Sequence, residues 1–194
     1  SQEVYTHQDH CVAELSVIPI TSSMENPEDD ASWEEAVAFC SLLGGLSWLL
    51  ITRADIAAFV GFLQRLAGKP LKRHLKMINA VLKYVKRRST GLRFVKLKGR
   101  PYLLVVADSA YQSTEKRDDC IAMRGYFLFL ACAQEQGGFP GGQVQLLDFI
   151  VKRLHVVSRS AFAAELRNVL EAAQDAINSA VQFHEIYRGP YTAE

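Results

Sequence analysis

The sequence lacks a hydrophobic run long enough to cross a membrane, and it contains few cysteines. Its longest apolar stretch, Leu42–Ile51, is about half of the ~20 residues that a membrane-spanning helix needs. No basic segment followed by an apolar core, the mark of a secretory signal, stands near the first residue. The four cysteines form no Cys-x-x-Cys pair, which favours free thiols in a reducing compartment, the cytoplasm or the nucleus. These absences predict a globular chain without a membrane span and leave the organelle open.

Two long stretches of the chain lack charges of one sign. Residues 1–52 hold nine acidic side chains and no Lys or Arg, whereas residues 69–100 hold twelve Lys or Arg and no acid. Lys and Arg gathered in this way suit a phosphate backbone, which they bind without reading its sequence. The candidate nucleic-acid-binding residues are Lys69, Lys72, Arg73, Lys76, Lys83, Lys86, Arg87 and Arg88.

The basic block of residues 69–100 also fits two roles that involve no nucleic acid. It could be a solvated helix face, although such faces tend to mix charges of both signs. It could also pair with an acidic protein surface, including residues 1–35 of this chain. In that case the block would contribute to folding or assembly and would not bind nucleic acid.

The N-terminal part of the chain predicts an acidic, extended lead-in followed by a helical module. The lead-in covers residues 1–31 and the helical module residues 32–91. Ser32 and Glu35 have the spacing of a capping box, so the first helix should begin at about Trp33. A second helical run follows Thr52–Asp55, and a third covers Leu71–Arg87. The apolar stripe expected on the third helix consists of Leu75, Ile78, Leu82 and Val85.

From Leu92 onward the pattern changes to strands and one final helix. Strands are predicted at Phe94–Lys98, Tyr102–Ala107, Ile121–Ala133 and Val144–Val157. Ser160 should cap a long helix that ends at Gly189, followed by a tail of residues 189–194. One side of the helix should carry Phe162, Leu166, Val169, Ala173, Ile177, Val181 and His184. The aromatic residues expected in a core are Trp33, Trp48, Phe127 and Phe129.

Many short motifs of residues 39–187 follow an order that is known from one family. The first group ends at Gly91-Leu92 and comprises Ser41–Gly44, Thr52-Arg53, Asp55-Ile56, Leu63, Arg65, Pro70, His74, Val81-Leu82 and Tyr84–Lys86. The second group comprises Val106–Tyr111, Arg124–Phe129, Phe149–Arg153 and Ser160–Leu166. In this order and spacing they resemble copia-type retrotransposon polyproteins, from the end of the polymerase region into the ribonuclease H domain. Ala54 stands where the family usually has Pro.

The resemblance implies a fold and a set of site residues. Residues 32–91 would be a module like the polymerase thumb or connection, and residues 92–188 a partial ribonuclease H-like module. Asp108 and Glu165 would correspond to the first two carboxylates of the ribonuclease H site, which holds Mg²⁺. The family's further carboxylates follow this helix, and the chain ends at Glu194. We therefore expect Asp108 and Glu165 to be vestigial, metal to be held weakly or not at all, and no cofactor to be required.

The sequence as a whole predicts an α+β chain with a helical module before an incomplete ribonuclease H-like β-β-β-α module. It contains no Tyr-x-Asp-Asp motif of a polymerase. The leading hypothesis is a retrotransposon-derived fragment that is catalytically incomplete and binds an RNA–DNA hybrid or another nucleic acid. The alternative is a domesticated, non-catalytic subunit that docks with protein partners in a larger assembly.

Overall fold

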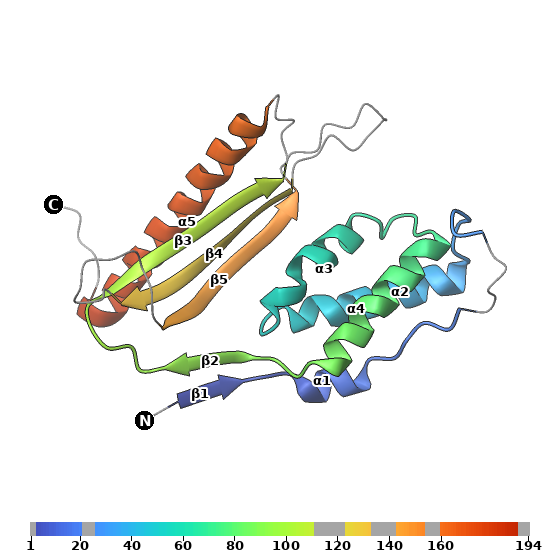
Figure 1. The fold of residues 1–194 in the computed structure, drawn as a ribbon, viewed down its shortest axis with the longest axis horizontal. Helices are drawn as coiled ribbons and strands as arrows, with labels where there is room; N and C mark the ends of the chain where they lie inside the picture. Colours follow the sequence, from blue (N-terminus) through green and yellow to red (C-terminus); the bar gives the residue numbers. More distant parts are fainter. Residues whose placement is uncertain (1–2, 21–25, 111–122, 133–142, 154–159, 190–194) are drawn as a thin grey trace. The chain divides into compact units, whose positions relative to one another are not determined.

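The computed structural model describes residues 3–20, 26–110, 123–132, 143–153 and 160–189, and it has an α+β fold (Figure 1). The chain divides into two compact units. The helical unit is Val4–Phe94, and the sheet unit comprises Val95–Glu194 together with Ser1–Glu3. The predicted α+β class is confirmed, whereas the likeness of the second module to ribonuclease H stays a prediction.

The helical unit is built on α2 (Trp33–Leu49), α3 (Ala57–Gln64) and α4 (Lys72–Arg87), with a short 3-10 turn, η1 (Ala54–Ile56), before α3. The predicted capping box opens α2: the Ser32 N–H donates to the Glu35 carboxylate at 2.8 Å, and the Glu35 N–H donates to Ser32 Oγ at 3.3 Å. These two bonds satisfy donors that would otherwise be left unpaired in the first helical turn. The predicted start of this helix is therefore confirmed.

The core of the helical unit is formed by the three helices together. The stripe predicted on α4, Leu75, Ile78, Leu82 and Val85, is fully buried. It packs with side chains of the other two helices, among them Phe39, Leu46, Val60 and Leu63. The spacing of large aliphatic residues thus identified the inward side of α4 correctly.

The predicted lead-in is not extended throughout. Within its described part it contains β1 (Glu3–Thr6), which pairs with β2 (Leu92–Val95), and α1 (Asp9–Glu14). The segment after α1 is attached to α4 by two buried hydrogen bonds: the Ile18 N–H donates to Asn79 Oδ1 at 2.9 Å, and Asn79 Nδ2 donates to the Ile18 carbonyl at 2.8 Å. This segment therefore belongs to the core, because its backbone groups and the side chain of Ile18 are buried there.

Both tryptophans lie outside the core in which they were expected. The side chains of Trp33 and Trp48 are 79% and 62% exposed. Helical geometry explains Trp48, because 100° per residue puts it on the side of α2 opposite to Phe39 and Leu46. Phe127 and Phe129 are partly buried and stack on each other with ring centroids 6.0 Å apart.

The sheet unit is a three-stranded antiparallel sheet covered on one face by a long helix (Figure 1). Its strands are β3 (Pro101–Ala110), β4 (Met123–Cys132) and β5 (Val144–Arg153), in the order β3-β4-β5, and the helix is α5 (Ala161–Arg188). Ser160 caps α5 as predicted, since its Oγ accepts from the Ala163 N–H at 3.1 Å. The predicted strand end at Val157 and the tail lie outside the described residues.

The apolar side predicted along α5 is not the side that packs on the sheet. The residues buried against the sheet are Ala164, Asn168 and Ala172, whereas Phe162, Leu166, Val169 and Ile177 are exposed. Small side chains let the helix backbone come close to the strands, and a stripe of large side chains would hold it away. The large apolar side chains of α5 therefore form an outer face. In the described part of the chain, no helix is long and apolar enough to span a bilayer.

Candidate nucleic-acid interface

The first part of the basic block is paired within the helical unit. Lys69, Lys72 and Arg73 form ion pairs with Asp30, Glu35 and Glu28, at 3.0, 2.7 and 2.5 Å respectively. The chain reverses so that residues 27–35 lie against the beginning of α4. The predicted pairing of the basic block with the acidic N-terminal segment is therefore confirmed for these three cations. Each of these three cations therefore already has an acidic partner within the chain.

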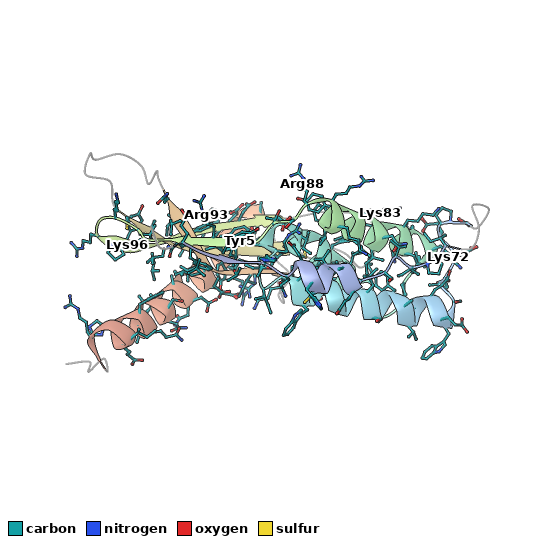
Figure 2. All side chains as sticks on the ribbon, turned by 90° about the horizontal axis from the view of Figure 1, so that it is seen from below. Tyr5, Lys72, Lys83, Arg88, Arg93 and Lys96 are labelled. Carbon is teal, nitrogen blue, oxygen red and sulfur yellow. The ribbon has the colours of Figure 1, made fainter. Side chains whose placement is uncertain are left out.

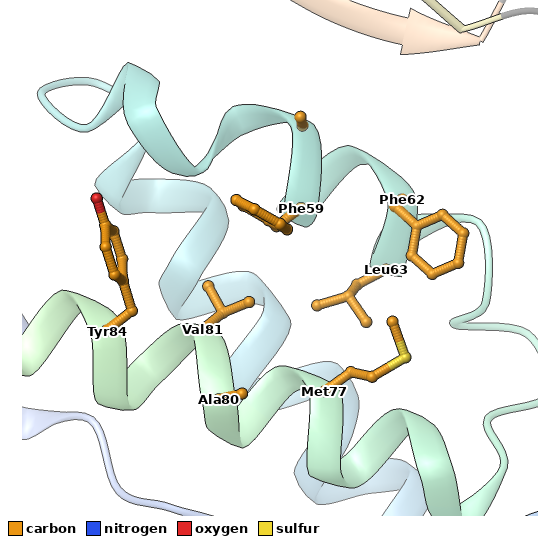
Figure 3. A pocket seen from close by; sticks show the side chains of 8 residues that line it. Phe59, Phe62, Leu63, Met77, Ala80, Val81 and Tyr84 are labelled. Atoms are coloured by element: carbon orange, nitrogen blue, oxygen red, sulfur yellow. The ribbon is translucent and has the colours of Figure 1, made fainter.

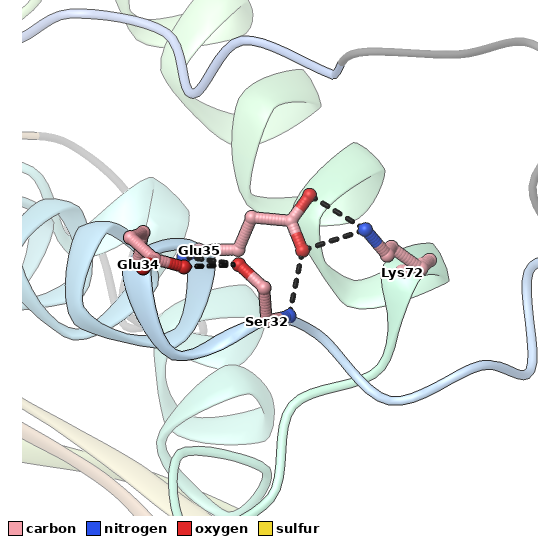
Figure 4. A network of polar contacts seen from close by, with 4 residues as sticks. All are labelled: Ser32, Glu34, Glu35 and Lys72. Carbon is pink, nitrogen blue, oxygen red and sulfur yellow. Dashed lines mark hydrogen bonds and ion pairs between the residues drawn. The ribbon is translucent and has the colours of Figure 1, made fainter.

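The pair between Lys72 and Glu35 is the most protected of the three (Figure 4). Both side chains are largely buried, and Lys72 Nζ lies 2.8 and 2.7 Å from the two carboxylate oxygens of Glu35. The hydrogen bond from Lys72, more than any other contact, holds the pKa of Glu35 below its ordinary value. Removal of either partner would leave a largely buried charge without its counter-ion.

Backbone groups of the same segment close the beginning of α4. The Lys72 N–H donates to the Asp29 carbonyl at 2.9 Å, and the Arg73 N–H donates to the Pro27 carbonyl at 3.0 Å. The first N–H groups of a helix have no partner inside the helix, so these carbonyls occupy an end that could otherwise attract an anion. The N-terminus of α4 is consequently unavailable to a phosphate.

The second part of the block remains exposed. Among the described residues, no acidic side chain pairs with Lys76, Lys83, Lys86 or Arg87. Lys76, Lys83 and Arg87 are seven and four residues apart, so they follow one side of α4, and we name these three residues the basic row. Lys83 lies toward the end of α4 opposite to Lys72 (Figure 2). The candidate interface is therefore the exposed side of α4 that carries the basic row, from Lys76 to Arg87.

A buried arginine, which the sequence pattern did not assign to the site, organises this end of α4. Arg53 binds Asp55 through two hydrogen bonds of 2.8 Å and donates a third, also 2.8 Å, to the Arg88 carbonyl. These bonds raise the pKa of Arg53 and lower that of Asp55. In the sequence, the Thr52–Asp55 motif indicated a helix start and contributed to the family resemblance, and it gave Arg53 no role of its own, yet Arg53 ties the loop after α2 to the end of α4. The only signal in the sequence was an Arg placed two residues before an Asp.

The helix dipole gives a structural reason for some of these cations. Lys86 and Arg87 lie in the last turn of α4, where positive charges stabilise a helix. Lys76 and Lys83 are one or more turns away from that end, and the dipole acts over about one turn. Stabilisation of the helix dipole therefore explains the cations in the last turn of α4, and it does not explain Lys76 and Lys83.

The two carboxylates suggested by the resemblance lie on different sides of the sheet unit. Ala107 pairs with Tyr126, whose hydroxyl donates to Asp175 of α5 at 2.6 Å, so these positions face the helix. Successive side chains of a strand alternate between the two faces, and Asp108 therefore points away from α5. Glu165 is exposed on α5 itself. The sheet separates the two carboxylates.

The sheet face beneath α5 holds a polar cluster of a different kind. Asn168 Nδ2 donates to the carbonyls of Asp108 and Gly125 at 2.6 and 2.9 Å, and the guanidinium of Arg124 is buried and paired with Glu171. Burial lowers the pKa of Arg124. Mg²⁺ needs converging oxygen ligands, and a buried cation at this face opposes it. The described residues contain no group of three or more metal-ligating side chains.

In comparisons with protein-family models, with curated proteins and with solved structures, nothing matches this chain.

Proposed function

We propose that the chain is a non-catalytic segment, similar to the reverse transcriptase/ribonuclease H region of copia-type retrotransposons, that binds nucleic acid without sequence preference. The ordered motifs described above support the family. The observation that carries the binding function is the basic row, with Lys86 and Arg88 beside it, exposed and without an acidic partner among the described residues. No catalytic step is proposed, since Asp108 lies on the sheet face away from α5, the helix that carries Glu165.

The length of the basic row suits a phosphate backbone. Eleven residues separate Lys76 from Arg87, which corresponds to about 16 Å along a helix. Phosphates of one duplex strand follow one another at about 3.4 Å along the axis, so the row spans about five of them. Lys and Arg at this spacing contact the backbone and leave the bases unread, which supports binding to an RNA–DNA hybrid as well as to other duplexes.

Fluorescence anisotropy with a labelled RNA–DNA hybrid between 50 and 200 mM salt tests the proposal. With five phosphate contacts, log K should fall against log salt with a slope of about −4 to −5. The double variant Lys76→Glu/Lys83→Glu should weaken binding at least tenfold and make the slope shallower by about 2. The matched control Lys152→Glu/Arg188→Glu makes the same charge change in the sheet unit and should leave binding unchanged. Absence of binding at 50 mM salt, or equal losses in both double variants, would contradict the proposal.

The catalytic part of the proposal has its own test. The protein should not cleave an RNA–DNA hybrid in Mg²⁺ or Mn²⁺. Cleavage that Asp108→Asn abolishes would show that this carboxylate works in a metal site, and the chain would then be an enzyme.

A protein-docking subunit is the second candidate, and exposed apolar side chains favour it. Besides the outer face of α5, Phe59 and Phe62 of α3 are exposed although they are large and hydrophobic. Exposed apolar side chains that gather in one place are typical of surfaces that bind partners.

A further inference from the structure

An apolar groove runs between α3 and α4 within the helical unit (Figure 3). It has a volume of about 760 Å³, and its walls are formed by Phe59 and Phe62 of α3 and by Met77, Val81 and Tyr84 of α4. Figure 3 shows these side chains turned toward the space between the two helices. The groove exists because Ala58 and Ala80 contribute only a methyl group each to its lining.

The side chains of this groove would gain from being covered. Phe59 is 59% exposed, and Phe62, Met77 and Tyr84 are also exposed. Burying a large apolar side chain is worth about 1.5–3 kcal/mol, and the core beneath, at Val60, Leu63 and Ile78, is already closed. Covering this groove would therefore take several large apolar side chains out of water.

The basic row forms one rim of the groove. Lys76 precedes Met77 and Lys83 precedes Tyr84 along α4, and Arg87 follows Tyr84 by three residues, so each cation lies beside or within one turn of a lining residue. Within the described structure these cations have no acidic partner. The groove thus combines an apolar floor with a positive rim.

We propose that this groove binds an amphipathic helix of a protein partner, with its apolar side in the groove and acidic side chains along the basic row. From Met77 to Tyr84 the wall extends over seven residues, about 10 Å, which matches two turns of a bound helix with anchors at i, i+3 or i+4, and i+7. The acidic flank follows from charge complementarity, which selects partners and speeds their association.

The lining favours such a helix over a nucleic-acid strand inside the groove. Bases carry hydrogen-bonding edges, and Tyr84 supplies the lone polar side-chain group among the lining residues described. The guanidinium groups of Arg53 and Arg88 lie 5.9 and 5.7 Å from the centre of the Tyr84 ring, so this ring already has cationic neighbours. The proposal does not depend on nucleic-acid binding, although both ligands would use the basic row and would compete for it.

The probe is a labelled, stapled helical peptide of 14 residues with Leu at i, i+4 and i+7 and Glu along one flank. A second peptide keeps the Leu residues and carries Lys along the same flank. The intact chain should bind the Glu peptide at least tenfold more tightly than the Lys peptide in fluorescence anisotropy at 100 mM salt. Phe59→Ser and, separately, Lys83→Glu should each weaken binding of the Glu peptide at least tenfold.

The matched control is Trp48→Ser, which removes an aromatic side chain of similar exposure, 62%, from α2 outside the groove. It should leave peptide binding unchanged. Equal affinity for both peptides, no binding at 100 µM protein, or an equal loss in Trp48→Ser would overturn the proposal.

Other occupants give different results with the same variants. A dimer in sedimentation velocity that Phe59→Ser abolishes would assign the groove to a second copy of the chain. Phe59-dependent binding to phosphatidylserine vesicles without peptide binding would assign it to a membrane surface. Phe59→Ser should leave the affinity for the RNA–DNA hybrid unchanged, and a loss there would assign the groove to nucleic acid. Peptide binding without hybrid binding would overturn the proposed function alone.

Discussion

The helical unit and the sheet unit differ in what stabilises the interior of each. In the helical unit thirteen buried apolar residues form one continuous cluster, which includes Phe39, Leu46, Leu75, Ile78 and Leu82. In the sheet unit the corresponding cluster of buried residues consists of Tyr126, Leu128 and Ala172. The first unit has a core of large aliphatic side chains, whereas the second has a thin apolar layer.

Polar contacts take a larger share in the sheet unit. Beneath α5 lie the amide of Asn168, the guanidinium of Arg124 and the hydroxyl of Tyr126, all buried. Buried polar groups contribute only when they are hydrogen-bonded, and they are costly when one partner is lost. The comparison indicates that α4 is held by the volume of its side chains, whereas α5 is held by small side chains together with buried polar contacts.

The largest expected effect on the free energy of unfolding comes from truncating a large apolar side chain in the helical unit, compared with the same truncation in the sheet unit. Leu82→Ala should lower the free energy of unfolding by about 3–4 kcal/mol, because it opens a cavity in a closed core. Leu170→Ala, on α5, should change it by less than about 0.5 kcal/mol, because the side chain is 62% exposed. Urea denaturation followed by circular dichroism measures both. Equal losses would mean that the outer face of α5 is covered in the protein in solution.

Removal of a buried amide should come second in size. Asn168→Ala removes the buried amide that donates to the carbonyls of Asp108 and Gly125, and we expect a cost of about 2–3 kcal/mol. Asn178→Ala changes an exposed amide on the same helix and should be nearly neutral. The measurement is again urea denaturation, and a neutral Asn168→Ala would show that hydrogen bonds do not fix α5.

A third change removes one hydroxyl from the sheet unit. Tyr126→Phe loses the bond to Asp175, and we expect a loss of about 1–2 kcal/mol at pH 7. Burial, followed by the bond to Asp175, raises the pKa of Tyr126 above its ordinary value. Above pH 10 the unfolded state therefore loses this proton while the native state keeps it, and the stability of the unchanged protein should fall as pH rises. The stability of Tyr126→Phe, measured by urea titration, should fall less steeply between pH 9 and 11. Parallel stability curves for the two proteins would contradict this.

The smallest expected effect concerns a buried histidine of the helical unit. His74 Nδ1 accepts from the Leu71 N–H at 3.0 Å, and burial, with the neighbouring Arg73, lowers the pKa of His74, while Glu28 opposes this shift. The unfolded state binds the proton at a higher pH than the native state, so stability should decrease as pH falls below about 6.5. His74→Gln keeps an acceptor for Leu71 and should flatten the profile between pH 7 and 5. An unchanged profile would show that His74 does not titrate in this range.

The sequence predicted the helical unit better than the sheet unit for a physical reason. In α4 the large aliphatic residues and the core lie on the same side, so the period of the pattern identified the inward face. In α5 the pattern also identified a helix, but the approach of the helix to the sheet selected Ala164, Asn168 and Ala172. Leu166 and Val169 point outward because the distance between the helix and the sheet leaves no room for large side chains. That distance is set by tertiary packing and is not encoded in a local sequence pattern.

The candidate site was predictable in composition and not in detail. The excess of Lys and Arg in residues 69–100 was visible, as was the excess of acid before it. The pairing of Lys69, Lys72 and Arg73 with residues 28–35 depends on a reversal of the chain between them, and it divides the block into a neutralised and an exposed part. The groove was hidden for a similar reason, because Phe59 shares the apolar spacing of Val60 and Leu63 and differs from them only in exposure.

Glu35 links the formation of two helices that are far apart in the sequence. Its Oε2 accepts from the Ser32 N–H, which caps α2, and also from Lys72 Nζ at the first turn of α4. The first turn of a helix is the costly one to form, and a contact over 37 residues adds the entropy of closing a loop. One carboxylate stabilises both first turns, so each nucleus lowers the cost of the other. The two helices should consequently appear together in folding, in a single cooperative step.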